Sequence, residues 1–244
     1  MLKIENTEAY GWEAAIRGMR NPMNSWEKSD SNLSCECCEG CYYEPQNNTI
    51  RLAIETDECE AHWCNHTGLR LGENDLKLMK TLSKAGSDHG KFLRMITVTM
   101  DITAPLYWWK EFDTYKVGTV ANSCSTMHKI HAKEFTMNDF SCEYLEDPFL
   151  GGFRETIGLL NIARNGFLCA RKEENPLISA RDYWWQMIQL LPSSYNQRRT
   201  VQLNYQVLKA MYHARKNHKL DEWRTFCEWV ETLPYAKELI AGEE

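Results

Sequence analysis

A ten-residue alternating segment constrains the fold of this chain most strongly. From Arg94 to Thr103, apolar side chains on one face alternate with polar side chains on the other. The apolar face comprises Ile96, Val98, Met100 and Ile102. A period of two residues is typical of a β-strand with one buried face. Pro105 follows directly and suits the first turn of a helix, which would carry Leu106, Trp108, Trp109 and Phe112. We therefore expect a strand that runs straight into an aromatic helix.

Helical spacing dominates the remaining regular segments. Leu76, Met79 and Leu82 predict a helix that Gly86 closes with a left-handed cap. Four more helices are expected, over Phe153–Lys172, from the Ser179 cap to Pro192, from about Ser194 to Lys216, and over Asp221–Thr232. The sequence thus predicts one strand-poor α+β domain over residues 1–244, with a mostly helical half at 150–244. Residues 1 to about 70 indicate loops around one early helix, with a strand at Thr49–Ile54.

The overall composition is that of an ordinary globular chain. The 244 residues are 43% hydrophobic and carry a net charge of −6. No apolar run approaches the roughly 18 residues of a membrane span, and the first residues lack a basic segment followed by an apolar one. We therefore expect a cytoplasmic protein with no membrane partner. Nine tryptophans favour a large core and aromatic-lined pockets.

An acidic, cysteine-rich zone at residues 27–75 stands apart from the rest of the chain. From Glu27 to Asp75, eleven acidic residues face three basic ones, and six of the ten cysteines fall between Cys35 and Cys64. The candidate metal ligands are Cys35, Cys38, Cys41, Cys59 and Cys64. Their spacing differs from paired Cys-x-x-Cys modules, so reduced thiols are favoured over a zinc site, and zinc is not expected.

A stretch without acidic residues runs from Tyr183 to Leu220. It contains six lysines and arginines, Arg198, Arg199, Lys209, Arg215, Lys216 and Lys219. Two interpretations remain open, a solvated basic helix face and a site that attracts a phosphorylated small molecule. A nucleic-acid partner is not expected, because an acidic protein would need a denser basic stripe.

One predicted helix carries polar residues at both ends of an apolar stripe. Asn204, Leu208, Met211 and Arg215 recur at helical spacing, which places Asn204 and Arg215 about 16 Å apart on one face. The stripe is either a surface boundary or the wall of a pocket. In the second case, a guanidinium fork at Arg215 would face an anionic or a pyrimidine oxygen.

Three segments in this order resemble the flavin-dependent thymidylate synthases. Ile96–Trp109 is similar to the family's strand, Ala-Pro and aromatic helix; Thr114–Cys124 falls where the Arg-His-Arg-x-x-Ser-x-Asn-Glu-x-Ser signature belongs. Leu191–Trp223 resembles the family's Leu-Pro, Asn-x-Arg and later Arg motifs. The resemblance implies that fold, with a strand-poor sheet packed on the helical C-terminal half, and a homotetramer with sites built between subunits.

The signature itself departs from the family pattern. Its Arg, His and Arg are Thr114, Tyr115 and Lys116 here, its first Ser is Thr119, and its last Ser is Cys124. The Asn-Glu pair becomes Ala121-Asn122, a following phosphate-binding Arg becomes Thr126, and the Arg of the later motif becomes Gln206. Within the signature, two guanidinium groups and a carboxylate are therefore lost, and neutral hydroxyls do not replace their bidentate contacts.

The resemblance still assigns candidate site residues. Arg215, Lys116 and Tyr115 take the catalytic positions. Asn204, Gln206, Thr114 and Lys116 take the cofactor positions, and Arg215, Cys124, Ser125 and Arg198 take the substrate positions. Lys129 and Arg199 are further cations for a relocated phosphate contact. A thiol nucleophile at Cys124 is the less favoured reading, because a single cysteine in a turn more often packs than reacts.

Two functions follow from this resemblance, and a third from the cysteines. The first is a thymidylate synthase-like methyltransferase that binds dUMP, carries FAD, and uses methylene-tetrahydrofolate and NADPH as co-substrates. The second is a catalytically inactive or repurposed relative that binds a nucleotide or a protein partner. The third is a zinc-stabilised structural module defined by the cysteine-rich zone.

Overall fold

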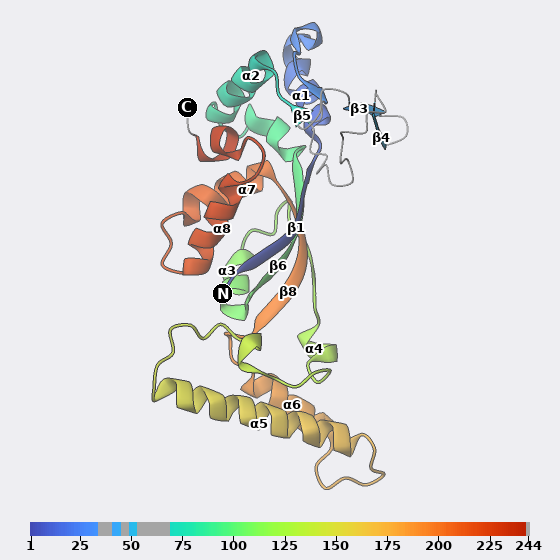
Figure 1. The fold of residues 1–244 in the computed structure, drawn as a ribbon, viewed down its shortest axis with the longest axis vertical. Helices are drawn as coiled ribbons and strands as arrows, with labels where there is room; N and C mark the ends of the chain where they lie inside the picture. Colours follow the sequence, from blue (N-terminus) through green and yellow to red (C-terminus); the bar gives the residue numbers. More distant parts are fainter. Residues whose placement is uncertain (34–40, 45–48, 53–68, 243–244) are drawn as a thin grey trace. The chain divides into compact units, whose positions relative to one another are not determined.

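The computed structural model describes residues 1–33, 41–44, 49–52 and 69–242, and side-chain environments outside 32–70 (Figure 1). The strands are β1 (Lys3–Tyr10), β2 (Asn32–Leu33), β3 (Cys41–Glu44), β4 (Thr49–Leu52), β5 (Leu69–Arg70), β6 (Thr97–Pro105), β7 (Val120–Ser123) and β8 (Asn196–Asn204). The α-helices are α1 (Trp12–Arg20), α2 (Glu73–Lys84), α3 (Leu106–Phe112), α4 (Thr126–Lys129), α5 (Phe149–Ala170), α6 (Ala180–Leu190), α7 (Tyr205–Arg215) and α8 (Asp221–Glu231). Short 3₁₀ helices are η1 (Asn21–Met23), η2 (Trp26–Lys28), η4 (Gly90–Arg94) and η5 (Met137–Asp139), and η6 (Lys237–Ala241) is a π-helical turn.

The main sheet has four strands in the order β1-β6-β8-β7. Strands β7 and β8 are antiparallel, with Val120 opposite Gln202 and Ser123 opposite Arg199. Two small antiparallel pairs, β2 with β5 and β3 with β4, complete the described strands. The predicted α+β class, poor in strands and rich in helices, is therefore confirmed.

Strand β6 confirms the alternating pattern from which the fold was predicted. Ile96, just before the strand, and Val98, Met100 and Ile102 within it are each at most 1% exposed. The strand leads directly into α3, and Pro105 is the residue that precedes the first turn. The polar face carries Asp101, which belongs to the candidate site described below.

The helix predicted from about Ser194 to Lys216 is wrong in its first half. Residues Asn196–Asn204 form strand β8, and only Tyr205–Arg215 form helix α7. The alternating burial of Val201 and Leu203 between exposed neighbours is a strand pattern that the helical stripe hid. Other predicted helices correspond to α2, α5, α6 and α8, and Ser179 caps α6 by accepting from the backbone N–H of Asp182.

The chain divides into two compact units. Unit 1 contains Met1–Thr7, Thr99–Gln202 and Ala214–Trp229. Unit 2 contains Glu8–Val98, Leu203–His213 and Val230–Glu244. The expectation of a single domain over residues 1–244 stays a prediction. Among the described residues, no helix combines the length and apolar character that crossing a bilayer requires.

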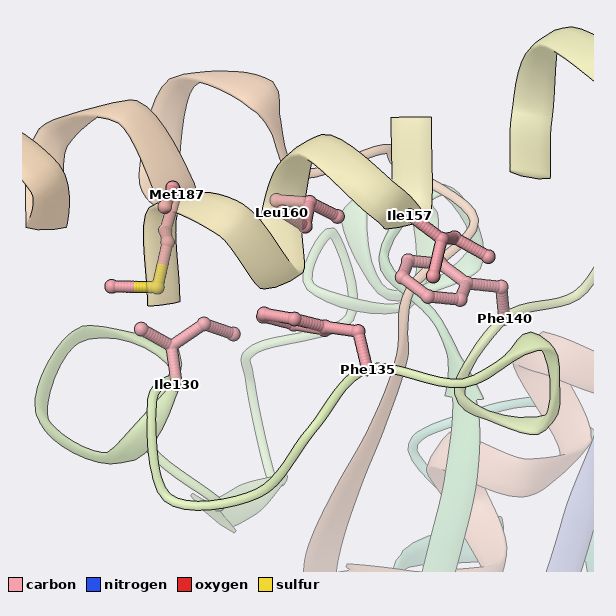
Figure 2. Close-up of a cluster of buried hydrophobic side chains, with 7 residues drawn as sticks. Ile130, Phe135, Phe140, Ile157, Leu160 and Met187 are labelled. Carbon is pink, nitrogen blue, oxygen red and sulfur yellow. The ribbon is translucent and has the colours of Figure 1, made fainter. Parts of the chain in front are cut away.

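Unit 1 has two clusters of buried side chains. The first is aromatic and includes Trp108, Trp109, Phe112, Trp223 and Phe226, with the rings of Trp108 and Trp223 centred 4.9 Å apart. The second joins α5 and α6 to the segment after α4 and comprises Ile130, Phe135, Phe140, Ile157, Leu160, Ala163 and Met187 (Figure 2). The tryptophans noted in the sequence thus contribute three fully buried rings to one core.

Unit 2 packs α2, η4, α7 and the C-terminal segment around a separate core. Met79, Leu93, Leu208, Met211 and Leu239 are each at most 1% exposed. Helix α2 begins at a close approach between two chain segments, because Asp30 accepts from the backbone N–H groups of Asn74 and Asp75. A Cβ at Gly72 would lie 2.2 Å from the Asp30 carboxylate carbon, so glycine is needed there.

Candidate functional site

An ion pair between the last turn of α3 and the end of α7 forms the centre of the candidate site in unit 1. Nη1 of Arg215 donates to Oε2 of Glu111 over 2.7 Å, and Nε of Arg215 donates to the hydroxyl of Tyr115 over 2.9 Å. The Arg215 side chain is only 19% exposed. The guanidinium is thus held by groups that lie 104 and 100 residues before it in the sequence.

Two further N–H groups converge on the same carboxylate oxygen. Nε1 of Trp223 donates to Oε2 of Glu111 over 3.0 Å, and Nε2 of His218 lies 3.4 Å from it. Because the backbone N–H of Leu220 donates to Nδ1 of His218, the proton of the neutral imidazole lies on Nε2 and faces Glu111. The Arg215 guanidinium lies 4.9 Å from the ring centre of Trp223 and 5.6 Å from that of Tyr115. One carboxylate oxygen therefore gathers donors beside two aromatic rings.

A second arginine, on β8, is bound by the other carboxylate at this end of α3. Nη1 of Arg199 donates to Oδ1 of Asp113 over 2.8 Å, and Nε donates to Oε1 of Gln197. Its guanidinium lies 4.1 Å from the ring centre of Trp109. Glu111 and Asp113 thus bind different arginines.

A third arginine, Arg198, is bound on the polar face of β6. Its Nη2 donates to Asp101 over 2.8 Å, and Asp101 also accepts from Thr200 and from Asn6. The hydrogen bonds from Thr200, Arg198 and Asn6 hold the pKa of Asp101 well below its usual range. The Arg198 side chain remains about half exposed and can accept a further ligand.

The stretch without acidic residues, Tyr183–Leu220, is paired with carboxylates from another part of the chain. Arg198, Arg199 and Arg215 each have a carboxylate partner, supplied by Asp101, Asp113 and Glu111 respectively. All three carboxylates come from the segment over β6, α3 and the residue after α3. The three arginines of the stretch are therefore locally neutralised within unit 1, and they attract an anion less strongly than the sequence alone suggests.

The structure brings Cys124 beside the predicted phosphate contact. The backbone N–H of Cys124 donates to the carbonyl of Arg198 over 2.9 Å, and its carbonyl accepts from the Gln197 side chain. The thiol of Cys124 is free and the residue is exposed. Ser125 accepts from the backbone N–H of His128, so it caps the short helix α4.

The degenerate signature positions lie in the turn that follows α3. The Thr114 hydroxyl donates to the carbonyl of Glu111 over 2.7 Å, so it serves the local turn. Lys116 is exposed, and Tyr115 is the only one of the three that contacts Arg215. Thr119 has a buried hydroxyl with no hydrogen-bond partner in the described part of the chain.

The two predicted cofactor residues of the later motif belong to unit 2. Asn204 is the last residue of β8, and its Oδ1 accepts from the backbone N–H of Val207 over 3.0 Å. This contact is a helix N-cap, so Asn204 does not begin the apolar stripe of a long helix as expected. Gln206 is half-buried in the first turn of α7.

The candidate metal ligands cannot be placed. Cys35, Cys38, Cys59 and Cys64 lie outside the described residues, and only the backbone of Cys41, at the start of β3, is described. Among the residues that the structure does describe, no group of three His, Cys, Asp or Glu side chains is arranged for a metal ion.

The donors at the positions assigned to FAD are of mixed type. Thr114, Lys116, Asn204 and Gln206 provide one hydroxyl, one ammonium and two amides. Only the oxygen of Asn204 is used for capping, which leaves its amide N–H groups as donors. Lys116 in unit 1 and the amides of Asn204 and Gln206 in unit 2 each carry N–H donors of a kind that a flavin nucleotide accepts, whereas the proton of Thr114 is already donated to the carbonyl of Glu111. At the position of the second signature arginine, Lys116 offers a single ammonium in place of a guanidinium fork.

Sequence reasoning assigned no role to Glu111 or His218. Glu111 was visible only as a carboxylate near the degenerate signature. Its partners Arg215 and Trp223 lie more than 100 residues away, and no local pattern pairs residues at that distance. Only the folded chain brings Glu111 next to Arg215 and Trp223.

Comparison with solved structures identifies proteins of similar architecture. The chain is similar to flavin-dependent thymidylate synthase ThyX from Helicobacter pylori, solved in complex with FAD and dUMP, with a TM-score of 0.59 and 13% identity. The match covers 98% of this chain and 97% of that chain, and a second structure of the enzyme matches equally well at 14% identity. The chain is also similar to the UMP/dUMP methylase PolB from Streptomyces cacaoi bound with 5-Br dUMP, with a TM-score of 0.54, 12% identity, and coverage of 97% and 91%.

Comparison of whole sequences does not detect this likeness. No protein-family model matches the chain, and no curated protein sequence matches it. Identity of 12 to 14% over nearly the whole length leaves the architecture as the shared property. The resemblance read from three short segments is thus confirmed at the level of the fold, and this chain has the fold of the flavin-dependent thymidylate synthases.

Proposed function

We propose that this protein binds a pyrimidine nucleotide of the dUMP type. The observation that carries the proposal is the full-length likeness to two different proteins, each solved with a dUMP-type nucleotide. The local geometry supports it, because Arg215 offers donors beside the rings of Tyr115 and Trp223. The half-exposed Arg198, adjacent to Cys124 and Ser125, supplies a cation for a phosphate.

The reaction we propose for this site is methylation of the nucleotide at C5. A methylene group from methylene-tetrahydrofolate replaces the C5 proton, and bound FAD, reduced by NADPH, supplies the hydride that completes the methyl group. In this proposal Arg215 orients the pyrimidine ring and Lys116 adds positive charge. Asn204 and Gln206 donate hydrogen bonds to the cofactor, and the hydroxyl oxygen of Thr114, whose proton is donated to Glu111, accepts one. We also propose a homotetramer, as the resemblance implies.

A second function, nucleotide binding without catalysis, is favoured by the state of the arginines. Glu111 and Tyr115 already occupy two edges of the Arg215 guanidinium. The signature positions hold Thr114 and Lys116, so the guanidinium forks of the family are absent there. A protein with this site can retain a nucleotide while lacking the grip on flavin that turnover requires.

Three measurements on the purified full-length chain separate these functions. The visible absorption spectrum, before and after reconstitution with FAD, reports flavin. Calorimetry with dUMP reports the nucleotide, and release of the C5 proton with methylene-tetrahydrofolate and NADPH reports catalysis. Flavin absorption together with C5 proton release supports the methyltransferase; dUMP binding without either supports the second function.

Two variants link the result to the site. R215Q should weaken dUMP binding at least tenfold, because it removes the donors that face the ring. K172Q removes one cation from an exposed position of unit 1 outside the site and should bind dUMP like the natural sequence. A chain that binds neither dUMP nor FAD would refute the proposed function.

A further inference from the structure

Glu111 is placed to act on a ligand and not only on Arg215. Its Oε2 receives the N–H groups of Arg215 and Trp223, and the N–H of His218 lies near the same oxygen. Its Oε1 accepts no hydrogen bond from any described residue. The side chain is 35% exposed. A carboxylate oxygen has more than one lone-pair direction, so Oε1 remains available as an acceptor.

Arg215 has donors left as well. Its Nε and one N–H of Nη1 are used by Tyr115 and Glu111, which leaves the second N–H of Nη1 and both N–H groups of Nη2. These groups belong to a guanidinium whose charge is balanced by the neighbouring carboxylate. An anion therefore gains little at this point compared with a free arginine, whereas a neutral polar edge gains a hydrogen bond.

The ion pair thus presents a donor next to an acceptor. The complementary ligand edge carries a carbonyl oxygen next to a ring N–H. A pyrimidine imide has this edge, in the form of a ring N3–H beside a carbonyl. The half-buried ring of Tyr115 lies beside the guanidinium, where a flat ligand ring can pack against it, and the ring of Trp223 on the same guanidinium is fully buried.

We propose that Glu111 is a specificity-determining residue that accepts the ring N3–H of a uracil-type nucleotide while Arg215 donates to the adjacent ring carbonyl oxygen. This inference rests on the proposed function, because it requires that the bound ligand is a pyrimidine nucleotide. It adds that this ion pair recognises the neutral ring edge, and that the phosphate is bound elsewhere. Asp113 takes no part in this recognition, because its carboxylate binds Arg199.

The test compares two ligands on three forms of the full-length chain. Calorimetry measures the dissociation constants of dUMP and of 3-methyl-dUMP, which lacks the ring N–H, for the natural sequence, E111Q and D113N. A hydrogen bond to a carboxylate should make the natural sequence prefer dUMP at least about tenfold. E111Q keeps an acceptor of the same size without the charge, so the preference should fall to about threefold or less. D113N removes a carboxylate two residues away and should keep the full preference.

The ratio of two affinities on one preparation does not depend on the fraction of chains that are folded. Steric exclusion of the added methyl group predicts the same preference in E111Q as in the natural sequence, because the two side chains have nearly the same shape. That result would overturn the inference, and so would equal affinity of the natural sequence for both ligands. Absence of dUMP binding would instead refute the proposed function itself, and this inference with it.

Discussion

Asp75 is a fully buried carboxylate at the centre of a hydrogen-bond network in unit 2. Its Oδ1 accepts from Nε of Arg20 over 2.6 Å, and its Oδ2 accepts from the hydroxyls of Ser29 and Ser31. Arg20 is itself 4% exposed. Burial by itself raises the pKa of Asp75, but hydrogen bonds from Ser31, Ser29 and Arg20 outweigh it and lower the pKa below its ordinary value.

Replacing Asp75 should therefore destabilise the fold in a pH-dependent way. D75N leaves the buried guanidinium of Arg20 without a counter-charge, at a cost of about 3–5 kcal/mol of unfolding free energy at neutral pH. Because the folded pKa is lowered, this stabilisation is complete above the unfolded pKa and is lost as pH falls through the folded one. Urea unfolding between neutral and acid pH measures the difference, with D88N, at an exposed aspartate of unit 2, as the control. A pH-independent difference between D75N and the natural sequence would contradict the assignment.

Two adjacent arginines on β8 should respond differently to substitution. R198Q should weaken dUMP binding about tenfold, through the phosphate, and leave the thermal midpoint nearly unchanged because the side chain is half exposed. R199Q removes the stack on Trp109 and the bond to Asp113 and should cost roughly 1–3 kcal/mol of stability. Calorimetry with dUMP and with deoxyuridine, which lacks the phosphate, separates the effects. R198Q should not alter deoxyuridine binding; equal losses for both ligands would argue against a phosphate contact.

Two adjacent leucines of α5 lie in opposite environments, one in the core and one in solvent. Leu160 is fully buried in the cluster that includes Ile157 and Met187 (Figure 2), whereas the adjacent Leu159 is 52% exposed. L160A should lower the unfolding free energy by about 2–5 kcal/mol, since it removes buried methyl groups and leaves a cavity. L159A makes the same chemical change on the solvent side and should cost less than about 1 kcal/mol. Denaturant titration of both variants is the measurement, and similar losses would mean that the orientation of α5 is wrong.

Asn204 connects β8 to α7 and is also a proposed cofactor residue. N204A removes the oxygen that caps the helix and should cost about 1 kcal/mol. N204S supplies another capping oxygen and should keep the stability. If the amide also donates to FAD, N204S should weaken FAD binding in an absorption titration while leaving the thermal midpoint intact. Unchanged FAD affinity in N204S would restrict Asn204 to capping.

The sequence predicted helices and strands well where a segment fits only one hydrophobic periodicity. The period of two in β6 and the caps at Ser179 and Gly86 were sufficient, because burial and local hydrogen bonds agree there. It failed at Asn196–Asn204, where a helix was extended backwards from the stripe that begins at Asn204, whereas the segment is a strand that pairs with β7. It did not predict β1, whose residues are mostly polar and exposed. Both β1 and β8 are strands because they pair with strands far away in the sequence, and a local sequence pattern does not reveal such pairing.

At the scale of the whole chain, the sequence named candidate site residues but did not reveal the carboxylates that pair with them. The stretch without acidic residues and Arg215 were visible in the sequence. The carboxylates that neutralise them were not, since Asp101 and Glu111 lie about a hundred residues earlier. Charge counted along the sequence thus overstated the positive potential at the site. The three-dimensional pairing favours a small, mostly neutral ligand with one phosphate over a polyanion.

This pairing predicts that the protein does not bind nucleic acid. With a net charge of −6 and a carboxylate partner for each of Arg198, Arg199 and Arg215, few counterions can be released on contact with a phosphate backbone. Fluorescence anisotropy with a labelled single-stranded DNA should show no binding at physiological salt. The variant D101N/E111Q/D113N removes the carboxylate charges that neutralise these three guanidinium groups and should gain weak binding, with a slope of about −2 in a double logarithmic plot against salt. Tight binding by the natural sequence with a steeper slope would show that basic groups other than these arginines form a nucleic-acid surface.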